Sequence, residues 1–424
     1  MPSMKWKLIY PKWHKLEGQT PFHLPPHGPV VFAAQVPRDI ELQFVDENVD
    51  EVGLEDSPDL VALSIMLTAQ LPRAFEIADH YRRRGIPVLA GGIAAMLHSE
   101  DAARHADSVF LGEVEGRLGR VVDDFRAGDL RPVYDYLSDP PPIESVGTAR
   151  REILNRPRYT YRSVQMLDLV HASRGCKFKC FPCCTPFLGG RNFRPRPIEK
   201  VVAEIQTIPN NRLFLVDNSL AQDSAWEEQL FKALVPLNKN WVSHPIEDND
   251  RLIALAREAG CWYVYQAVFD TSDFIRRRIQ RYHDHGIGVE ATVILGTDDH
   301  DVAAIKRLVD FLIEVKLDLA EFTIMTPFAH TPIRRQLEAE GRILDNDFRN
   351  YTCDRVVFQP KRMTPAQLQD MYHYAWETFY AQAPQEVKMG KLFTEVIRRE
   401  IANGTYLRPT RPTRPTCPTG KPAN

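Results

Sequence analysis

Three cysteines within eight residues constrain this chain more than any other feature of its sequence. They stand in the run Cys176-Lys-Phe-Lys-Cys180-Phe-Pro-Cys183, a spacing that lets three thiolates surround one iron–sulfur cube. Iron–sulfur clusters are held by cysteine thiolates, and a cube bound entirely by protein needs four of them. The trio therefore predicts a [4Fe–4S] cluster whose fourth iron is open for chemistry.

A structural zinc site is the main alternative for these cysteines. Its usual signature is two cysteine pairs, or one pair with two histidines, and no second half is visible in this sequence. Cys184 directly follows Cys183, where it is a poor ligand for the same metal. The other cysteines are scattered singly at Cys261, Cys353 and Cys417. The spacing thus favours a cluster over zinc or disulfides.

The residues around the trio resemble a known family. The stretch from Ser173 to Thr185, followed by Phe193-Arg-Pro-Arg-Pro-Ile-Glu-Lys-Val, resembles the cluster loop and first helix of radical S-adenosylmethionine enzymes. The resemblance implies that S-adenosylmethionine binds the fourth iron through its amino and carboxylate groups and is cleaved to a 5′-deoxyadenosyl radical. One departure is Pro182, where the family usually has an aromatic residue, while Phe181 lies one place earlier.

The first part of the chain alternates short apolar runs with helical patterns. Helices are expected over 71–84 and 115–127, each stopping at a glycine, and the expected strands are 7–10, 42–46, 60–64, 87–90 and 108–111. Such alternation predicts a parallel sheet covered on both faces, with ligands at the carboxyl ends of its strands. The candidate contacts at these ends are Ser64, Thr68, Gly91, Gly92, Gly112 and Glu113.

This first part resembles the cobalamin-binding, Rossmann or flavodoxin-like domain that precedes the barrel in one branch of radical S-adenosylmethionine enzymes. The resemblance rests on segments 46–51, 60–68, 84–93 and 106–115, and it implies that the candidate contacts bind cobalamin. The Asp-x-His-x-x-Gly motif that supplies a histidine to cobalt is missing, as is common in this branch. The alternative is a domain that has lost its ligand, because glycines at strand ends are also ordinary turn residues.

A proline-rich linker separates a second alternating part. Strands are expected near 167–172, 213–217, 263–268, 289–295 and 321–325, and five or six such units with the cysteines after the first strand fit the partial (β/α)₆ barrel of the family. The expected domains are 1–138 for the cobalamin-binding domain, 139–165 for the linker, 166–345 for the barrel, 346–403 for a C-terminal helical extension and 404–424 for a disordered tail.

Polar residues and a glycine at the strand ends of the barrel are the candidate contacts for S-adenosylmethionine. Carboxylates suit ribose hydroxyls and an ammonium group, and the candidates are Asp217, Glu247, Glu290 and Gly296. Asp217 and Glu247 could instead be helix caps, and Glu290 could face outward.

Two features at the end of the barrel concern the substrate. The motif that usually reads Thr-Pro-Phe/Tyr-Pro-Gly-Thr-Pro carries His330 here, either as a substrate contact or proton donor, or as a solvent-facing loop residue. Helix 365–380 is rich in aromatic residues, which favours core packing over a lining for an apolar substrate cavity.

The resemblance implies a cobalamin-dependent radical methyltransferase that acts on an unactivated carbon of a small-molecule or lipid-like substrate, with an electron donor such as flavodoxin or ferredoxin. Rearrangement, cyclisation or oxidation on the same architecture remains an alternative, as does a non-catalytic electron-transfer protein.

Composition sets further limits. The formal charge of −3 over 424 residues lacks the positive excess that is typical of nucleic-acid-binding proteins. No apolar run approaches the ~20 residues that span a bilayer, and no leader is evident. A cytoplasmic location is expected, because it suits reduced thiols and an oxygen-sensitive cluster.

Overall fold

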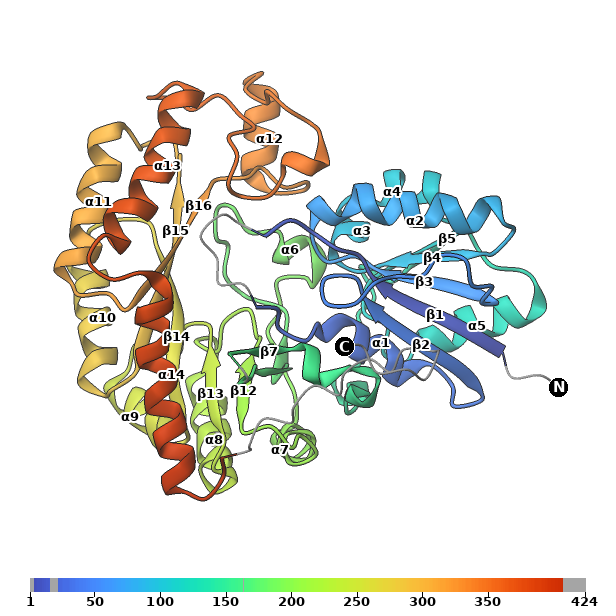
Figure 1. Ribbon diagram of the computed structural model, residues 1–424, viewed down its shortest axis with the longest axis horizontal. Coiled ribbons are helices and arrows are strands. Elements are labelled where there is room, and N and C mark those ends of the chain that lie inside the picture. Colours follow the sequence, from blue (N-terminus) through green and yellow to red (C-terminus); the bar gives the residue numbers. More distant parts are fainter. Residues whose placement is uncertain (1–3, 16–21, 163, 407–424) are drawn as a thin grey trace, which may run out of the picture.

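Two parallel six-stranded sheets, each flanked by helices, form the two units of the protein. The computed structural model describes residues 4–15, 22–162 and 164–406. Figure 1 shows the first unit in blue to cyan beside the second in green to red, with the short helix α6 (Thr185–Leu188) lying between them. Residues 407–424, which hold most of the expected disordered tail, lie outside the described residues.

The first sheet has the strand order β2-β1-β3-β4-β5-β6, and all its pairs are parallel. Its strands are β1 (Met4–Tyr10), β2 (Ile40–Asp46), β3 (Leu60–Ser64), β4 (Val88–Gly91), β5 (Ser108–Leu111) and β6 (Val133–Asp135). The helices are α1 (His27–Gln35), α2 (Leu71–Arg83), α3 (Ile93–Leu97), α4 (Ser99–His105) and α5 (Leu118–Ala127).

Helices bury both faces of this sheet. Leu63 packs with the α2 side chains in one core, while Leu60 packs with the α5 side chains in the other. Burial on both faces explains why the strands read as continuous apolar runs. All five expected strands and both expected helices are present, whereas β6, with only three residues, and α1 were not anticipated.

The second sheet has the order β16-β15-β14-β13-β12-β9 and is also parallel throughout. Its strands are β9 (Asp168–Val170), β12 (Arg212–Leu215), β13 (Asn240–Ser243), β14 (Cys261–Val268), β15 (Gly288–Leu295) and β16 (Leu319–Ile324). Among the described residues the edge strands β9 and β16 do not pair, so this is the open, partial barrel that the sequence predicted.

Helices cover the outer face of this barrel. They are α7 (Ile198–Gln206), α8 (Ser224–Leu234), α9 (Asp250–Glu258), α10 (Asp273–Asp284) and α11 (Val302–Glu314). Further along the chain come α12 (Pro332–Ala339), α13 (Pro365–Tyr380) and α14 (Gln385–Ala402). The aromatic helix α13 packs on α11 and β16, with Tyr372 and Phe379 in the core. Core packing is therefore the role of these two side chains.

Helix α14 covers the inner face of the barrel at the amino ends of its strands. Val396 packs there against Trp262 and Leu319. The buried Glu400 carboxylate accepts a hydrogen bond from the Arg212 guanidinium of β12. A ligand therefore reaches the interior from the carboxyl ends of the strands.

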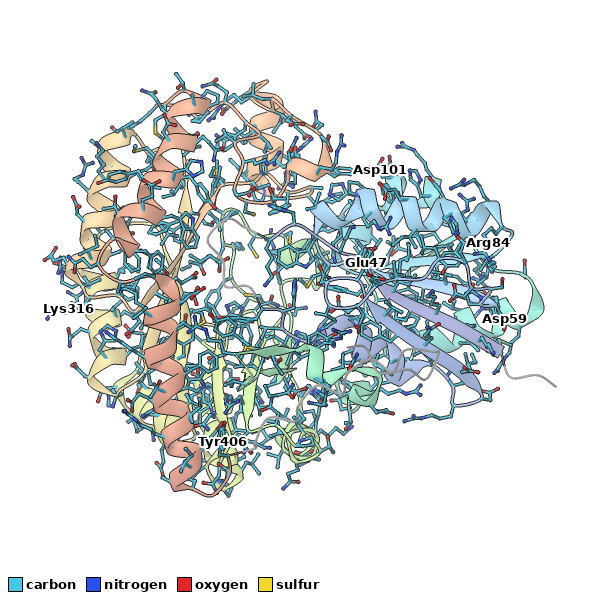
Figure 2. All side chains as sticks on the ribbon, in the orientation of Figure 1. Glu47, Asp59, Arg84, Asp101, Lys316 and Tyr406 are labelled. Atoms are coloured by element: carbon cyan, nitrogen blue, oxygen red, sulfur yellow. The ribbon has the colours of Figure 1, made fainter. Side chains whose placement is uncertain are left out.

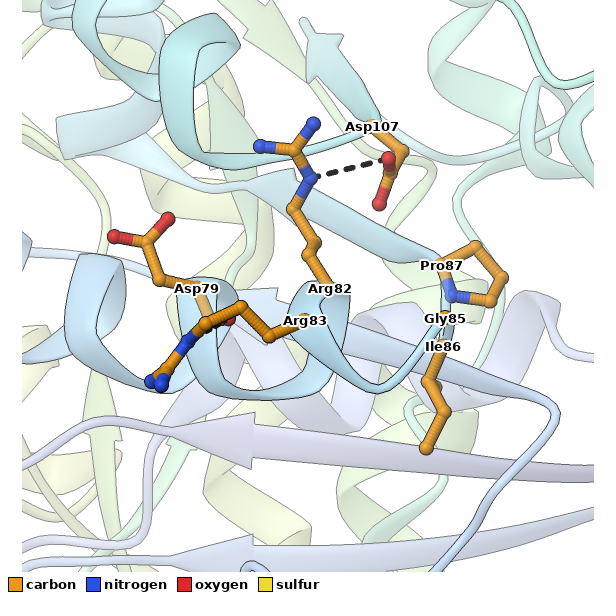
Figure 3. Close-up of a pocket in the computed structure, with 7 residues that line it drawn as sticks. All are labelled: Asp79, Arg82, Arg83, Gly85, Ile86, Pro87 and Asp107. Carbon is orange, nitrogen blue, oxygen red and sulfur yellow. Dashed lines mark hydrogen bonds and ion pairs between the residues drawn. The ribbon is translucent and has the colours of Figure 1, made fainter.

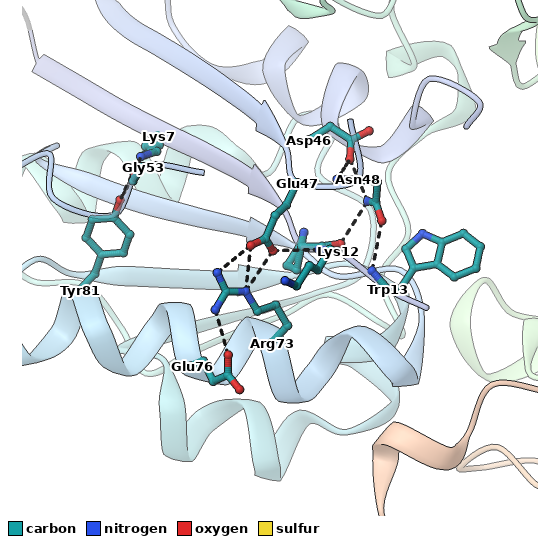
Figure 4. Close-up of polar contacts among 11 residues, drawn as sticks. Lys7, Lys12, Trp13, Asp46, Glu47, Asn48, Gly53, Arg73, Glu76 and Tyr81 are labelled. Carbon is teal, nitrogen blue, oxygen red and sulfur yellow. Dashed lines mark hydrogen bonds and ion pairs between the residues drawn. The ribbon is translucent and has the colours of Figure 1, made fainter. Parts of the chain in front are cut away.

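The carboxyl edge of the first sheet faces the second unit. Figure 2 shows Glu47, just after β2, on the side toward the barrel, and Asp59 and Arg84 at the far edge. Figure 4 shows how the loops of this carboxyl edge are fixed, since Arg73 of α2 binds the Glu47 carboxylate at 2.6 Å. Gln70 adds bonds to neighbouring backbone, including one to the Pro11 carbonyl at 2.6 Å. Loops at the carboxyl ends of the two sheets meet, because η1 (Thr68–Gln70), after β3, contacts η6 (Phe348–Asn350), beyond β16.

Candidate functional site

The three cysteines lie in an irregular loop between the two units. The loop leaves the short hairpin of β10 (Ser173–Arg174) and β11 (Arg194–Pro195) and leads into α6. Cys176 is buried, Cys183 is half-buried and Cys180 is exposed, and all three thiols are free. Burial raises the pKa of the Cys176 and Cys180 thiols, which a bound metal would offset by favouring thiolates.

The donor set of this loop fits an iron–sulfur cube better than a single metal ion. In the described part of the chain, no three His, Cys, Asp or Glu side chains converge closely enough to hold one ion. In a cube, each thiolate binds a different iron, so three separated sulfurs from one loop suit it. The backbone N–H of Thr185 also donates to Cys183 Sγ at 3.4 Å, and such bonds tune a cluster.

Asp217, a predicted contact of S-adenosylmethionine, lies at the root of this loop. It follows β12, is 1% exposed, and accepts hydrogen bonds from the Ala172 N–H at 3.0 Å and from the Ser173 hydroxyl. Burial raises its pKa to about 6 despite these bonds. The Asp217 carboxylate therefore fixes the strand that leads to the cysteines.

The residues after Asp217 hold the rest of the loop. Asn218 donates to the Gly175 carbonyl at 3.4 Å and accepts from the Thr185 hydroxyl at 3.3 Å. Gln222 accepts from the Lys177 N–H at 2.8 Å. The connection between β12 and α8 thus hydrogen-bonds the cysteine loop on both sides of the cysteines. The sequence did not predict this positioning role of Asn218 and Gln222, because amide side chains belong to no recognisable motif.

The other predicted contacts of S-adenosylmethionine lie at different depths. Gly296 follows β15 at the carboxyl edge with φ +92°, and a Cβ there would lie 2.6 Å from Leu368, so packing against α13 requires the glycine. The Glu247 N–H, after β13, is held by the Glu227 carboxylate at 3.1 Å. Glu290 is the third residue of β15 and accepts from the Tyr263 hydroxyl deep in the barrel. Glu290 is thus the one candidate far from the carboxyl edge.

The predicted cobalamin contacts gather at the carboxyl edge of the first sheet. Ser64 ends β3, Gly91 ends β4, and Thr68 is buried with its hydroxyl 3.2 Å from His98 Nε2. Glu113 forms an ion pair with Arg194 of the barrel. This side chain therefore joins the units.

Two of these glycines have an explanation within the fold. A Cβ on Gly92, at φ +96°, would lie 2.5 Å from the Ile65 carbonyl, and one on Gly112, at φ +109°, would lie 2.9 Å from the Tyr136 carbonyl. Both positions need glycine for backbone packing with or without a ligand.

Apolar surface at the same edge fits a flat ring. Met66 follows β3 with 43% of its surface exposed, and Ile93 follows β4 with 39% exposed. Side chains of this kind suit a face of a corrin that receives no histidine. The residues present are therefore compatible with cobalamin.

His330 lies beside the cysteine loop. Its backbone is left-handed at φ 63°, and its exposed imidazole stacks on Phe187 of α6 with ring centroids 3.8 Å apart. The imidazole thus supports the helix that follows the cysteines.

Aromatic and acidic side chains line the barrel interior, and most of them are not among the contacts predicted from the sequence. Phe214 stacks on Tyr265 at 5.2 Å, with His244 within 5.8 Å of both rings. The neighbouring Glu321 raises the pKa of Glu290 further after burial has done so. Period-two alternation along β12, β14 and β15 could have identified these inward positions.

A surface depression of about 650 Å³ lies away from this site. Figure 3 shows its lining, which includes Arg82, paired with Asp107 at 3.1 Å, and Pro87 just before β4. These residues mark the amino edge of the first sheet. A second depression, of about 710 Å³, lies between His14 of the first unit and the segment around Asp354.

Comparisons with known proteins agree with this architecture. No family model matches the chain. The chain is 23% identical over 390 residues to bacteriochlorophyllide d C-12(1)-methyltransferase of Chlorobaculum tepidum, covering 85% of this chain and 83% of that protein. It is 22% identical over 367 residues to hopanoid C-2 methylase of Rhodopseudomonas palustris, covering 79% and 68%.

Solved structures share the fold. The radical S-adenosylmethionine methyltransferase TsrM of Kitasatospora setae, with cobalamin and a [4Fe–4S] cluster bound, matches with a TM-score of 0.62 at 16% identity, covering 91% of this chain and 92% of that one. The cobalamin-dependent S-adenosylmethionine radical enzyme OxsB matches with a TM-score of 0.65 at 12% identity, covering 95% and 72%. In the described residues, every helix is too short or too polar to cross a membrane.

Proposed function

We propose that this chain, a radical S-adenosylmethionine enzyme with a cobalamin-binding domain, is a methyltransferase acting on an unactivated carbon of a small molecule. The observation that carries the proposal is the position of the cysteine loop. The trio follows the first barrel strand and lies between the carboxyl edges of two parallel sheets, where such sheets bind ligands. The relatives named above are methyltransferases.

Three groups of residues would each bind one cofactor. Cys176, Cys180 and Cys183 would hold the [4Fe–4S] cluster, and the carboxyl edge of the barrel around Asp217, Glu247 and Gly296 would hold S-adenosylmethionine. The edge around Ser64, Thr68, Gly91, Gly92 and Gly112 would hold cobalamin. When bound, these groups supply a carbon radical and a transferable methyl group, which protein side chains cannot generate.

The chain's own side chains orient and shield these groups. The Asp217 carboxylate and the Gln222 amide fix the cysteine loop, and the stacked Phe187 and His330 rings support its far end. The interior wall of Phe214 and Tyr265 offers an apolar surface to the substrate. An external reductant such as flavodoxin or ferredoxin would supply electrons.

Cysteine variants test the radical chemistry. Anaerobically reconstituted, reduced protein should form 5′-deoxyadenosine from S-adenosylmethionine, and Ala at Cys176, Cys180 or Cys183 should abolish both bound iron and cleavage. Cys184→Ala is the matched control, since it changes the adjacent thiol and should keep both. Wild-type protein that forms no 5′-deoxyadenosine would exclude radical catalysis.

Product ratios test methyl transfer. A cobalamin-dependent methyltransferase uses one S-adenosylmethionine as methyl donor and a second as radical source, so S-adenosylhomocysteine and 5′-deoxyadenosine should form in about equal amounts with substrate. Formation of 5′-deoxyadenosine alone by cobalt-loaded enzyme would point to rearrangement, cyclisation or oxidation. Wild-type protein that binds no cobalt would contradict the assignment of the first unit.

A further inference from the structure

Five basic side chains from both units meet beside the cysteine loop. We call them the basic site: His27, Arg151, His171, Arg174 and Arg196. His27 opens α1 of the first unit, and its ring lies 4.6 Å from that of His171, which follows β9. Arg196 donates to the His171 carbonyl at 2.6 Å, and Arg151 to the Leu169 carbonyl at 2.7 Å. The basic site therefore lies where the first unit, the linker and the barrel join.

Carboxylates accept hydrogen bonds from only some of the N–H groups of the basic site. Glu204 pairs with Arg151 at 2.7 Å and with Arg196 at 2.8 Å, and Glu115 pairs with Arg174 at 2.7 Å. The Arg151 and Arg196 side chains are only 7% and 2% exposed, respectively.

Several donors of the basic site are buried without an acceptor. Within the described ranges, Arg151 Nη1, Arg174 Nε and Arg196 Nε have no hydrogen-bond partner. A buried donor without an acceptor destabilises the fold, and native proteins leave few such donors. Both oxygens of Asp217, the other carboxylate that acts on Arg174, are already bonded to Ala172 and Ser173.

The charge of the basic site resides on its arginines. Burial lowers the pKa of His27 and His171 well below the usual range, and the three neighbouring arginines lower it further. Both imidazoles are therefore neutral at pH 7, while the guanidinium groups keep their charge. Guanidinium groups bind oxygen anions, carboxylate or phosphate, with strong charge-assisted bonds.

We propose that the basic site binds a carboxylate or phosphate group of the ligand held between the two units. The anion supplies the acceptors that the buried guanidinium groups lack. Two sources carry this chemistry, the phosphodiester of the cobalamin nucleotide tail and a carboxylate on the substrate. The identity of that ligand rests on the proposed function. The binding of an anion does not, because it requires no catalysis.

Inorganic phosphate is the probe. Thermal unfolding of the full chain without cobalamin or substrate should shift upward by about 2 °C at saturating phosphate, and Arg196→Gln should abolish the shift. Arg151→Lys is the second variant, in case Arg196→Gln does not fold, because it can keep the ion pair with Glu204 while removing the Nη1 donor.

Two controls separate this site from others. Arg212→Gln removes a buried, ion-paired arginine at the amino end of the barrel, and Arg82→Gln removes a cation of the depression in Figure 3. Both should keep the phosphate shift. The proposal would be overturned if phosphate did not raise the unfolding temperature of the wild type, or if it raised that of Arg196→Gln or Arg151→Lys by as much. The buried donors would then bind water and no anion.

Corrinoid binding then identifies the source of the anion. If phosphate weakens cobalamin binding about fivefold or more without affecting cobinamide, which lacks the nucleotide tail, the tail phosphate occupies the site. If phosphate affects neither, a substrate carboxylate occupies it. Equal weakening of both would mean that the corrin ring covers the site, which overturns the anion assignment. Failure of 5′-deoxyadenosine formation would leave all these results intact and would contradict only the proposed function.

Discussion

Glu227 of α8 is a fully buried acid, and no cation among the described residues is bonded to it. Both of its oxygens accept the Glu247 N–H, at 3.1 and 3.3 Å. Burial raises the pKa of its carboxyl to about 8. Between the unfolded value of about 4.3 and this folded value, the folded state binds a proton that the unfolded state does not. The contribution of Glu227 to stability therefore falls as pH rises through this window.

Glu227→Gln should consequently raise the free energy of unfolding by about 5 kcal/mol at pH 9, which is about 1.4 kcal/mol for each unit between the two pKa values, and by only about 1 kcal/mol at pH 5. At pH 5 the wild-type carboxyl is already neutral in the folded state. Thermal unfolding at the two pH values measures the difference. Glu228→Gln is the control, because this half-buried neighbour pairs with Arg251 and Lys232 and should show no gain at pH 9. If Glu227→Gln changed the free energy of unfolding equally at both pH values, the carboxyl of Glu227 would not have a raised pKa in the folded state.

At the residue scale, the sequence predicted positions better than roles. Asp217 was expected at a strand end and lies there, but its partners, Ala172 and Ser173, come from another strand and could not be read from local pattern. Gly92 is predicted to contact cobalamin, and the Ile65 backbone next to its Cβ position gives a second reason for the glycine that needs no ligand. Such roles depend on contacts distant in sequence, whereas the cysteine trio is local and needed no fold to be recognised.

At the scale of elements, Gly175 decides how the cysteine loop leaves its hairpin. Its φ is +74°, and a Cβ would collide with the Asn192 carbonyl that lies across the loop. Gly175→Ala should therefore lower iron content after reconstitution severalfold and destabilise the fold by more than the ~1 kcal/mol of a left-handed alanine. Gly190→Ala is the matched control, since φ is +70° and nothing lies within 4 Å. Similar iron content in the two variants would show that a small backbone shift removes the clash without disturbing the cluster site.

Elements with strong patterns were predicted, whereas the short strands β13 and β6 were not. Strand β15 is eight residues long and mostly apolar, while β13 is only Asn240–Ser243 and β6 only Val133–Asp135. The strands paired with them, on both sides of β13 and on one side of the edge strand β6, stabilise such short segments, and that context is absent from the local sequence. Helix α1 carries Pro29 and Gly28 in its first turn, which hid its helical pattern.

At the scale of the whole molecule, two ion pairs join the first unit to the cysteine hairpin. Glu113 and Glu115, after β5, pair with Arg194 and Arg174 of the two hairpin strands. The Glu115 side chain is 2% exposed in its pair. Because buried pairs lose several kcal/mol when one partner is removed, these contacts set the spacing of the two carboxyl edges between which the cofactors would lie.

Glu115→Gln should loosen the docking of the units without unfolding either sheet. The variant leaves the half-buried Arg174 guanidinium without its carboxylate, at a cost of about 3 kcal/mol, and the segment over residues 139–165 should become more sensitive to limited proteolysis. Asp107→Asn is the matched control, because it breaks the exposed pair with Arg82 at the far edge of the same sheet and should change the cleavage rate little. Equal cleavage of Glu115→Gln and wild type would mean that apolar contacts, such as the α3–α6 packing, hold the units together without this pair.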